Sequence, residues 1–161
     1  RFLGYSGDNE AVIWAAKSGA FDVIQTSFNL VDQGARHGLL EEIRSRGLGL
    51  IAKRPILNGV WRVEADPDPY HNGYASEYFR RQREMVEPGG LLPGEPEDRI
   101  AASLAFTLGH PEVTVAIVGT KNPAHLAANV ALVEKLPDAQ EFIAAAHRRF
   151  DEVGGEWEQR T

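Results

Sequence analysis

Short apolar stretches alternate along the chain with segments whose apolar residues recur every three or four positions. The first pattern predicts strands and the second predicts helices. Strands are expected at residues 2–6, 22–28, 48–52 and 113–118. Helices are expected between residues 8 and 19, at 36–46, from 96 or 97 to 108, from 123 to 136 and at 139–153. Strands that alternate with helices predict an α/β fold with a parallel sheet and right-handed crossovers.

Individual residues support these helix boundaries. Asp8 or Asn9 can cap the first helix, which Gly19 ends. Asn122 can cap a later helix, and Pro123 fits its first position, where a missing N–H costs nothing. The residues 113–118 that precede this helix are expected to form a strand covered on both faces. The helices are expected to turn the following apolar residues inward: Val12, Ala15 and Ala16; Leu39, Leu40 and Ile43; Ile100, Leu104 and Leu108; Leu126, Val130, Val133 and Leu136; Phe142, Ile143, Ala146 and Phe150.

Residues 56–97 form a long insert that differs from the rest of the chain. It contains five prolines and several glycines, and only residues 74–85 have the pattern of a short polar helix. Five aromatic residues can pack within it: Trp61, Tyr70, Tyr74, Tyr78 and Phe79. A connection of this length in a compact domain is usually functional or mobile. We therefore interpret it as a lid or flank beside a ligand site rather than a linker between domains.

The composition fits a single globular domain that spans all 161 residues. With 43% hydrophobic and 25% charged residues, disordered and collagen-like classes are excluded. The net charge is −6, and the lysine and arginine residues are not clustered in the sequence. Both features argue against nucleic-acid binding. The absence of cysteine excludes disulfide and thiolate metal sites and fits a reducing compartment, so we expect a cytoplasmic protein.

The ends of the sequence and its apolar runs bear on membranes and processing. No apolar run approaches the roughly 18 residues of a membrane helix, so no membrane partner is expected. No signal peptide pattern opens the chain. Arg1 leads directly into a strand pattern, and we therefore expect that residue 1 is not the natural start of the protein.

Polar residues collect where each predicted strand ends. They occupy positions 6–8, 25–29, 53–55 and 119–122. In parallel sheets with helical crossovers, ligands bind at the carboxyl ends of the strands. We therefore expect one polar ligand site across all four strand ends.

The last of these strand ends leads into a helix start with the features of an anion site. Backbone N–H groups at a helix N-terminus attract phosphate, and Lys121 and His125 stand beside them. An ordinary, well-capped turn between a strand and a helix explains the same residues equally well. Both interpretations remain open from these residues alone.

Four stretches resemble the aldo-keto reductase family and occur in its order: RFLGYSG, DVIQTSFNL, GLIAKRPILNG and AIVGTKNPAHLAANV. Together they resemble the C-terminal half of such a reductase. The resemblance implies half of a TIM (β/α)8 barrel, built from four βα units plus a C-terminal helix. It also implies that the whole enzyme interconverts carbonyl compounds and alcohols by hydride transfer with NADP(H).

The resemblance assigns cofactor-binding roles to eleven residues. The residues that match those bonding the nicotinamide carboxamide are Ser6 and Gln25, and those that match the turn between nicotinamide and pyrophosphate are Lys53, Arg54 and Pro55. The loop that holds the adenosine phosphate is matched by Gly119, Thr120, Lys121 and Asn122. The helix positions near that phosphate and the adenine are matched by His125 and Asn129. Each also has an interpretation without a ligand. Gln25 can bond a neighbouring strand, and Lys53 and Arg54 can form a solvated rim.

Two departures from the family pattern bear on the cofactor. Lys53 and Arg54 stand where many members have an aromatic residue that stacks on the nicotinamide. His125 stands where the family usually has an arginine near the 2′-phosphate, although Lys121 can supply the charge. NADP(H) is therefore the expected cofactor, with NAD(H) as the alternative.

The catalytic acid of the family is a tyrosine with aspartate, lysine and histidine partners, and it lies in the first half of the barrel. We find no counterpart of that half. Tyr5 lies in the wrong strand, and Tyr70 and His71 have no Lys–Asp pair at a suitable spacing. No metal-binding cluster, nucleophile elbow or P-loop is present in the sequence. No residue is therefore expected to be catalytic, and the chain alone is expected to be inactive.

Four strands of an eight-stranded barrel leave unpaired edges, near Leu3 and Ile117. We therefore expect a partner, which is the missing N-terminal half, a second copy or another chain. The preferred hypothesis is the NADP(H)-binding half of a reductase that acts on a small-molecule carbonyl or alcohol. The alternatives are a self-associating half-barrel that binds a nucleotide or phosphorylated ligand, and a non-catalytic partner subunit.

Overall fold

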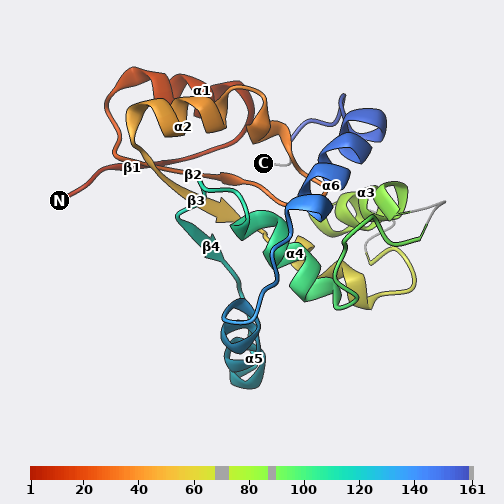
Figure 1. The fold of residues 1–161 in the computed structure, drawn as a ribbon. Helices are drawn as coiled ribbons and strands as arrows, with labels where there is room; N and C mark the ends of the chain where they lie inside the picture. Colours follow the sequence, from red (N-terminus) through yellow and green to blue (C-terminus); the bar gives the residue numbers. More distant parts are fainter. Residues whose placement is uncertain (68–72, 87–89, 160–161) are drawn as a thin grey trace.

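The computed structural model describes residues 1–67, 73–86 and 90–159. Four parallel strands form one sheet in the order β1-β2-β3-β4, which confirms the predicted α/β arrangement (Figure 1). They are β1 (Gly4–Ser6), β2 (Val23–Ser27), β3 (Gly49–Lys53) and β4 (Val115–Ile117). Ser6 pairs with Gln25, and Lys53 pairs with both Ser27 and Ile117. The four carboxyl ends therefore lie at the same end of the sheet.

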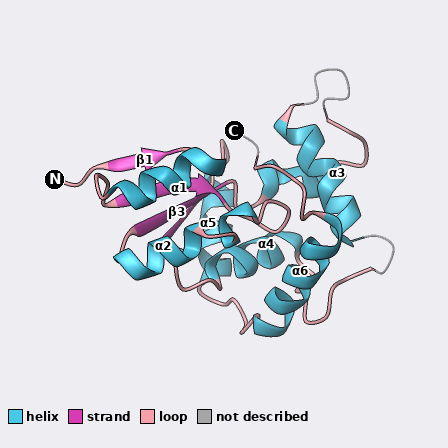
Figure 2. Ribbon diagram, turned by 90° about the horizontal axis from the view of Figure 1, so that it is seen from above, coloured by secondary structure: helices cyan, strands magenta, loops and turns pink. Residues whose placement is uncertain are grey.

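Helices separate the strands, as the sequence predicts. They are α1 (Asn9–Ser18), α2 (Leu39–Arg46), α3 (Tyr74–Val86), α4 (Arg99–Leu108), α5 (Pro123–Val133) and α6 (Gln140–Val153), with the 3-10 turns η1 (Gly34–Arg36) and η2 (Leu57–Arg62). α1 packs beside α2, α3 contacts α6, and α4 contacts β4 and α5 (Figures 1 and 2). Figure 1 shows α5 projecting beyond the sheet from the end of β4.

Capping residues set several helix boundaries. The side chain of Asn122 accepts a hydrogen bond from the backbone N–H of Ala124 at 3.0 Å, so it caps α5 as predicted. Gly47 ends α2 in the left-handed conformation. The predicted start of that helix at residue 36 is wrong. α2 begins at Leu39, because Gly38, with a φ of 99°, separates it from η1.

The start of α1 also differs from the prediction. Asp8 occupies the N-cap position, but its side chain makes no capping hydrogen bond. Asn9 is the first helical residue and instead bonds Gln159, 150 positions away, through its side chain and its backbone N–H. Residues 154–159, the C-terminal tail, are thus fastened to the start of α1. Gly34 makes room for this tail, because a Cβ there would lie 2.8 Å from Cγ of Gln159.

Most of the predicted inward faces are buried, and they form one core with the apolar residues of β2 and β3. The buried members of these faces are Val12, Ala15, Ala16, Leu39, Ile43, Leu104, Phe142, Ile143, Ala146 and Phe150. Phe28 and Phe106, whose ring centroids are 5.7 Å apart, join the sheet to α4. Four of the predicted inward-facing residues are only half-buried: Leu40, Ile100, Leu108 and Leu136.

The expectation that β4 is covered on both faces is wrong for this chain. Val115 and Ile117 are each 46% exposed, and β4 is an edge strand that pairs with β3 alone among the described residues. The predicted inward face of α5 is exposed as well, with Leu126 at 53% and Val130 at 54%. Apolar patterning indicates which surface is suited to burial, and the described part of this chain does not supply the covering.

The insert contains the predicted helix at 74–85, which is observed as α3. Tyr78 and Phe79 are buried, and the indole of Trp61 donates a hydrogen bond to Ser103 on α4 at 2.8 Å. Tyr70 and His71 lie outside the described residues. None of the described helices is both long and apolar enough to span a membrane.

Candidate functional site

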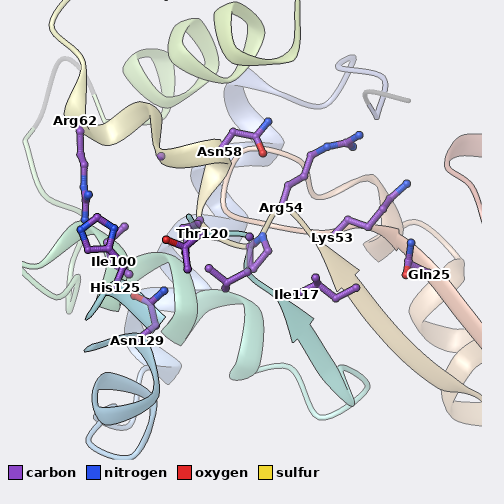
Figure 3. Close-up of a pocket in the computed structure, with 15 residues that line it drawn as sticks. Gln25, Lys53, Arg54, Asn58, Arg62, Ile100, Ile117, Thr120, His125 and Asn129 are labelled. Atoms are coloured by element: carbon purple, nitrogen blue, oxygen red, sulfur yellow. The ribbon is translucent and has the colours of Figure 1, made fainter. Parts of the chain in front are cut away.

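A cleft of about 540 Å³ opens at the carboxyl ends of the strands. It lies between the turn that follows β3 and the loop that joins β4 to α5 (Figure 3). Eight of the eleven predicted site residues line it: Gln25, Lys53, Arg54, Pro55, Gly119, Thr120, His125 and Asn129. Ser6, Lys121 and Asn122 do not line it. The structure thus brings together residues from three strand ends and from the first turns of α5.

Ser6 and Gln25 form a polar pair at the ends of β1 and β2. The register places them side by side, and the Gln25 amide nitrogen donates a hydrogen bond to the Ser6 hydroxyl at 3.0 Å. No other described residue bonds either side chain, so the amide oxygen and the hydroxyl proton remain for a ligand. One acceptor beside one donor matches the needs of a carboxamide group.

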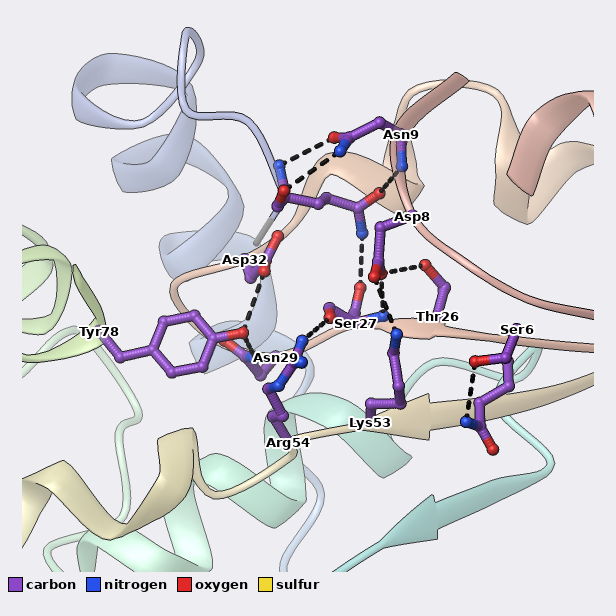
Figure 4. A network of polar contacts seen from close by, with 12 residues as sticks. Ser6, Asp8, Asn9, Thr26, Ser27, Asn29, Asp32, Lys53, Arg54 and Tyr78 are labelled. Carbon is purple, nitrogen blue, oxygen red and sulfur yellow. Dashed lines mark hydrogen bonds and ion pairs between the residues drawn. The ribbon is translucent and has the colours of Figure 1, made fainter. Parts of the chain in front are cut away.

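Asp8 organises the strand ends, although the sequence predicts for it only a turn or a helix cap. Its buried carboxylate accepts hydrogen bonds from the Thr26 hydroxyl at 2.9 Å and the Ser27 backbone N–H at 2.6 Å. It also pairs with the Lys53 ammonium at 2.8 Å (Figure 4). Burial raises the pKa of Asp8, but the hydrogen bonds from Lys53, Ser27 and Thr26 outweigh it and lower the pKa below its usual value.

The turn after β3 has an unusual backbone. Arg54, Leu57 and Asn58 all have φ values between 54° and 57°, in the left-handed region that residues other than glycine seldom adopt. The Arg54 guanidinium donates a hydrogen bond to the Ser27 hydroxyl at 2.5 Å, which ties the turn to the end of β2. Such backbone conformations cost free energy and persist only where surrounding contacts hold them in place. They are frequent at ligand sites.

The opposite wall of the cleft begins with a well-capped turn. The Thr120 hydroxyl accepts a hydrogen bond from the Asn122 N–H at 3.1 Å, and the Asn122 side chain is used to cap α5. These two hydrogen bonds are the contacts expected of an ordinary, well-capped turn between a strand and a helix. His125 and Asn129, one and two turns into α5, face the cleft, whereas Lys121 is exposed outside it.

Seven further residues line the cleft that the sequence-based prediction did not name as site residues: Ile56, Asn58, Gly59, Arg62, Ile100, Ile117 and Val118. Asn58 and Arg62 come from η2, and Ile100 comes from the first turn of α4. No aspartate or glutamate is among the described residues that line the cleft. Its charged groups are cationic, so it is suited to an anionic ligand. The only sequence signal for Arg62 is its position in the insert interpreted as a flank of the ligand site.

Tyr78 and two histidines away from the cleft have partners within the described fold. Tyr78 is fully buried and donates a hydrogen bond to the Asp32 carboxylate at 3.1 Å, and its burial raises its pKa. His110 and His147 contact each other through their Nε2 atoms at 2.9 Å between α4 and α6. No group of three or more metal-ligating side chains was found in the described parts of the chain.

Comparison with known proteins gives a consistent result. The profile of the aldo/keto reductase family matches residues 4–147. Two solved structures of the aldo-keto reductase AKR11C1 from Bacillus halodurans, its holo and apo forms, superpose with TM-scores of 0.67 and 0.69 at 19% identity. Each alignment covers 92% of this chain but 50% of the other, so the chain spans about half the length of these relatives. No curated protein sequence matches significantly.

Proposed function

Because this chain belongs to the aldo/keto reductase family, we propose that it is the C-terminal, cofactor-binding half of a reductase that interconverts small carbonyl compounds and alcohols. The observation that carries the proposal is the cleft at the strand ends, which has no aspartate or glutamate among its described lining residues. Eight of the eleven residues to which the family resemblance assigns a cofactor role line this cleft.

The expected cofactor is NADP(H), with NAD(H) as the alternative. It supplies the hydride when bound, and the residues of this chain bind and orient it. Ser6 and Gln25 offer a donor and an acceptor to its carboxamide. Three residues of the β3 turn are assigned to the pyrophosphate: Lys53, Arg54 and Pro55. The remaining residues are assigned to the adenosine end: Gly119, Thr120, Lys121, Asn122, His125 and Asn129.

Reduction of a carbonyl also requires a proton donor held near the carbonyl oxygen. No tyrosine is among the described residues that line the cleft, and the Tyr78 hydroxyl is buried and bonded to Asp32. We therefore assign the catalytic tyrosine and its partners to the other half of the barrel. The chain alone is expected to bind cofactor without turning over a substrate.

The exposed edges of the sheet support this assignment. β1 pairs only with β2, and β4 only with β3, in the described chain, and Val115 and Ile117 are exposed on β4. Unpaired strands with apolar side chains favour association with further strands. The proposed covering is the N-terminal half of the barrel, and self-association is the alternative.

Titration calorimetry of the purified chain with NADPH tests the proposal. We expect saturable binding with one site per chain. In parallel, NADPH absorbance is followed with an aromatic aldehyde as substrate, and no oxidation is expected. Failure to bind NADPH or NADH would overturn the cofactor assignment. Sustained turnover that copurifies with the chain would show instead that the catalytic groups lie within it.

A further inference from the structure

Arg62 is a charged residue of the cleft for which the proposed function leaves no role. It ends η2, is exposed, and makes no hydrogen bond or ion pair with any residue that the structure describes. It lines the same cleft as Thr120, His125 and Asn129, which come from the opposite wall. Figure 3 shows its side chain extending from η2 toward His125 and Ile100, away from Lys53 and Arg54.

The basic side chains of the cleft are divided between its two ends. Lys53 is paired with Asp8, and Arg54 is bonded to Ser27, at the end nearer Gln25. The end near α5 has His125 and Arg62, while Lys121, the cation expected there, lies outside the described lining. Arg62 is therefore the group best placed to neutralise an anion bound beside α5.

We infer that Arg62 and His125 together bind the phosphate monoester of a phosphorylated dinucleotide, and so select NADP(H) over NAD(H). This inference rests on the proposed function and names the discriminating residue. A phosphate monoester carries a charge of about −1.5 to −2 and three acceptor oxygens. A guanidinium donates to two such oxygens at once, and an imidazole N–H from the opposite wall reaches another.

The placement of the two residues also explains how a chain with histidine at position 125 compensates for the arginine usual at that position in the family. The positive charge comes from η2, in the insert, and not from α5. A ligand that bridges Arg62 and His125 would join the insert to the last strand–helix unit, two segments that are 63 positions apart in the sequence.

The test compares NADP⁺ with NAD⁺ by titration calorimetry on the full chain and on Arg62→Gln, at one ionic strength. Loss of a charge-assisted, bidentate contact is expected to raise the dissociation constant for NADP⁺ roughly 10- to 100-fold and to leave that for NAD⁺ unchanged. Arg62→Lys should recover part of the loss, because it keeps the charge but not the fork. Arg148→Gln, an exposed arginine of α6, is the matched control.

A second pair of ligands removes the nicotinamide from the comparison. Arg62→Gln should weaken binding of adenosine 2′,5′-bisphosphate but not of adenosine 5′-monophosphate. Equal losses for both dinucleotides would assign Arg62 to a group that both share, such as the adenine or the pyrophosphate, and overturn the inference. An unchanged NADP⁺ affinity would overturn it as well. If the unmodified chain binds neither dinucleotide, the proposed function fails and this inference fails with it.

Discussion

Replacement of Asp8 by asparagine tests whether the ion pair with Lys53 holds the strand ends together. In the native chain Oδ1 accepts the hydrogen bonds from Thr26 and Ser27, and Oδ2 faces the Lys53 ammonium. Asp8→Asn can keep the first two bonds but turns an amide donor toward the ammonium. Breaking a buried ion pair costs roughly 3–5 kcal/mol. Because the Lys53 side chain is 20% exposed and can turn toward water, we expect about 2–3 kcal/mol.

Urea unfolding at pH 7, followed by circular dichroism, measures this loss as a lower midpoint at unchanged slope. Lys53→Met should cost a similar amount. The double variant should be less destabilised than the sum of the single variants, because the second change removes a charge already left unpaired. Asp22→Asn is the control, since the side chain of this exposed residue accepts a hydrogen bond from the Leu3 N–H, which an amide oxygen also accepts.

The same variant carries a pH dependence of known sign. The folded-state pKa of Asp8 is lowered, so its contribution is complete above the unfolded pKa of about 3.9 and is lost as the pH falls through the lower folded value. The difference between the native chain and Asp8→Asn should therefore be constant near neutrality and shrink below about pH 4. Additive single variants, or a difference that persists at low pH, would refute the role of the ion pair.

Three further predictions concern other parts of the chain. Burial, together with the charges of Arg36 and His110, lowers the pKa of His147 to about 4, so stability should fall as the pH drops from about 6.5 toward 4. After allowance for solvent screening the loss is about 1–2 kcal/mol by urea unfolding, and His147→Gln should reduce it; an unaltered profile in that variant would contradict this. Gln159→Ala removes hydrogen bonds to Asn9 and to the Ser27 carbonyl, and should speed amide exchange in the C-terminal tail; unchanged exchange would show that the tail is held by other contacts. Gln25→Leu should weaken NADP⁺ and NAD⁺ binding equally in calorimetric titrations, because the carboxamide is common to both; a loss confined to NADP⁺ would exclude this assignment.

Local patterns in the sequence predicted the order of elements, the parallel sheet and most buried helix faces. Apolar spacing and capping act within a few residues of the chain, so their consequences can be derived without tertiary information. Asn122 illustrates this, because its cap bonds the N–H two residues ahead. The position of the cleft was also predictable, since parallel topology brings all strand ends to one side.

The contacts that give the cleft its character could not be derived in this way. Asp8 pairs with Lys53, which is 45 positions away in the sequence, and Asn9 is hydrogen-bonded to Gln159, which is 150 positions away. Arg62 lines the cleft after a turn with left-handed backbone angles at Arg54, Leu57 and Asn58, a path that local sequence patterns do not specify. These long-range contacts depend on the path of each loop, which a periodic pattern does not specify.

The sequence by itself determined which residues form strands and helices, and which end of the sheet carries polar groups. It also marked Val115 and Leu126 as suited to burial. Only the tertiary structure decided that these side chains are exposed in the described chain, that Asp8 binds strand ends instead of capping α1, and that Arg62 faces α5. The physical reason is the sequence separation over which each effect acts. Periodicity and capping are short-range effects, whereas exposure and charge pairing depend on segments far apart in the sequence.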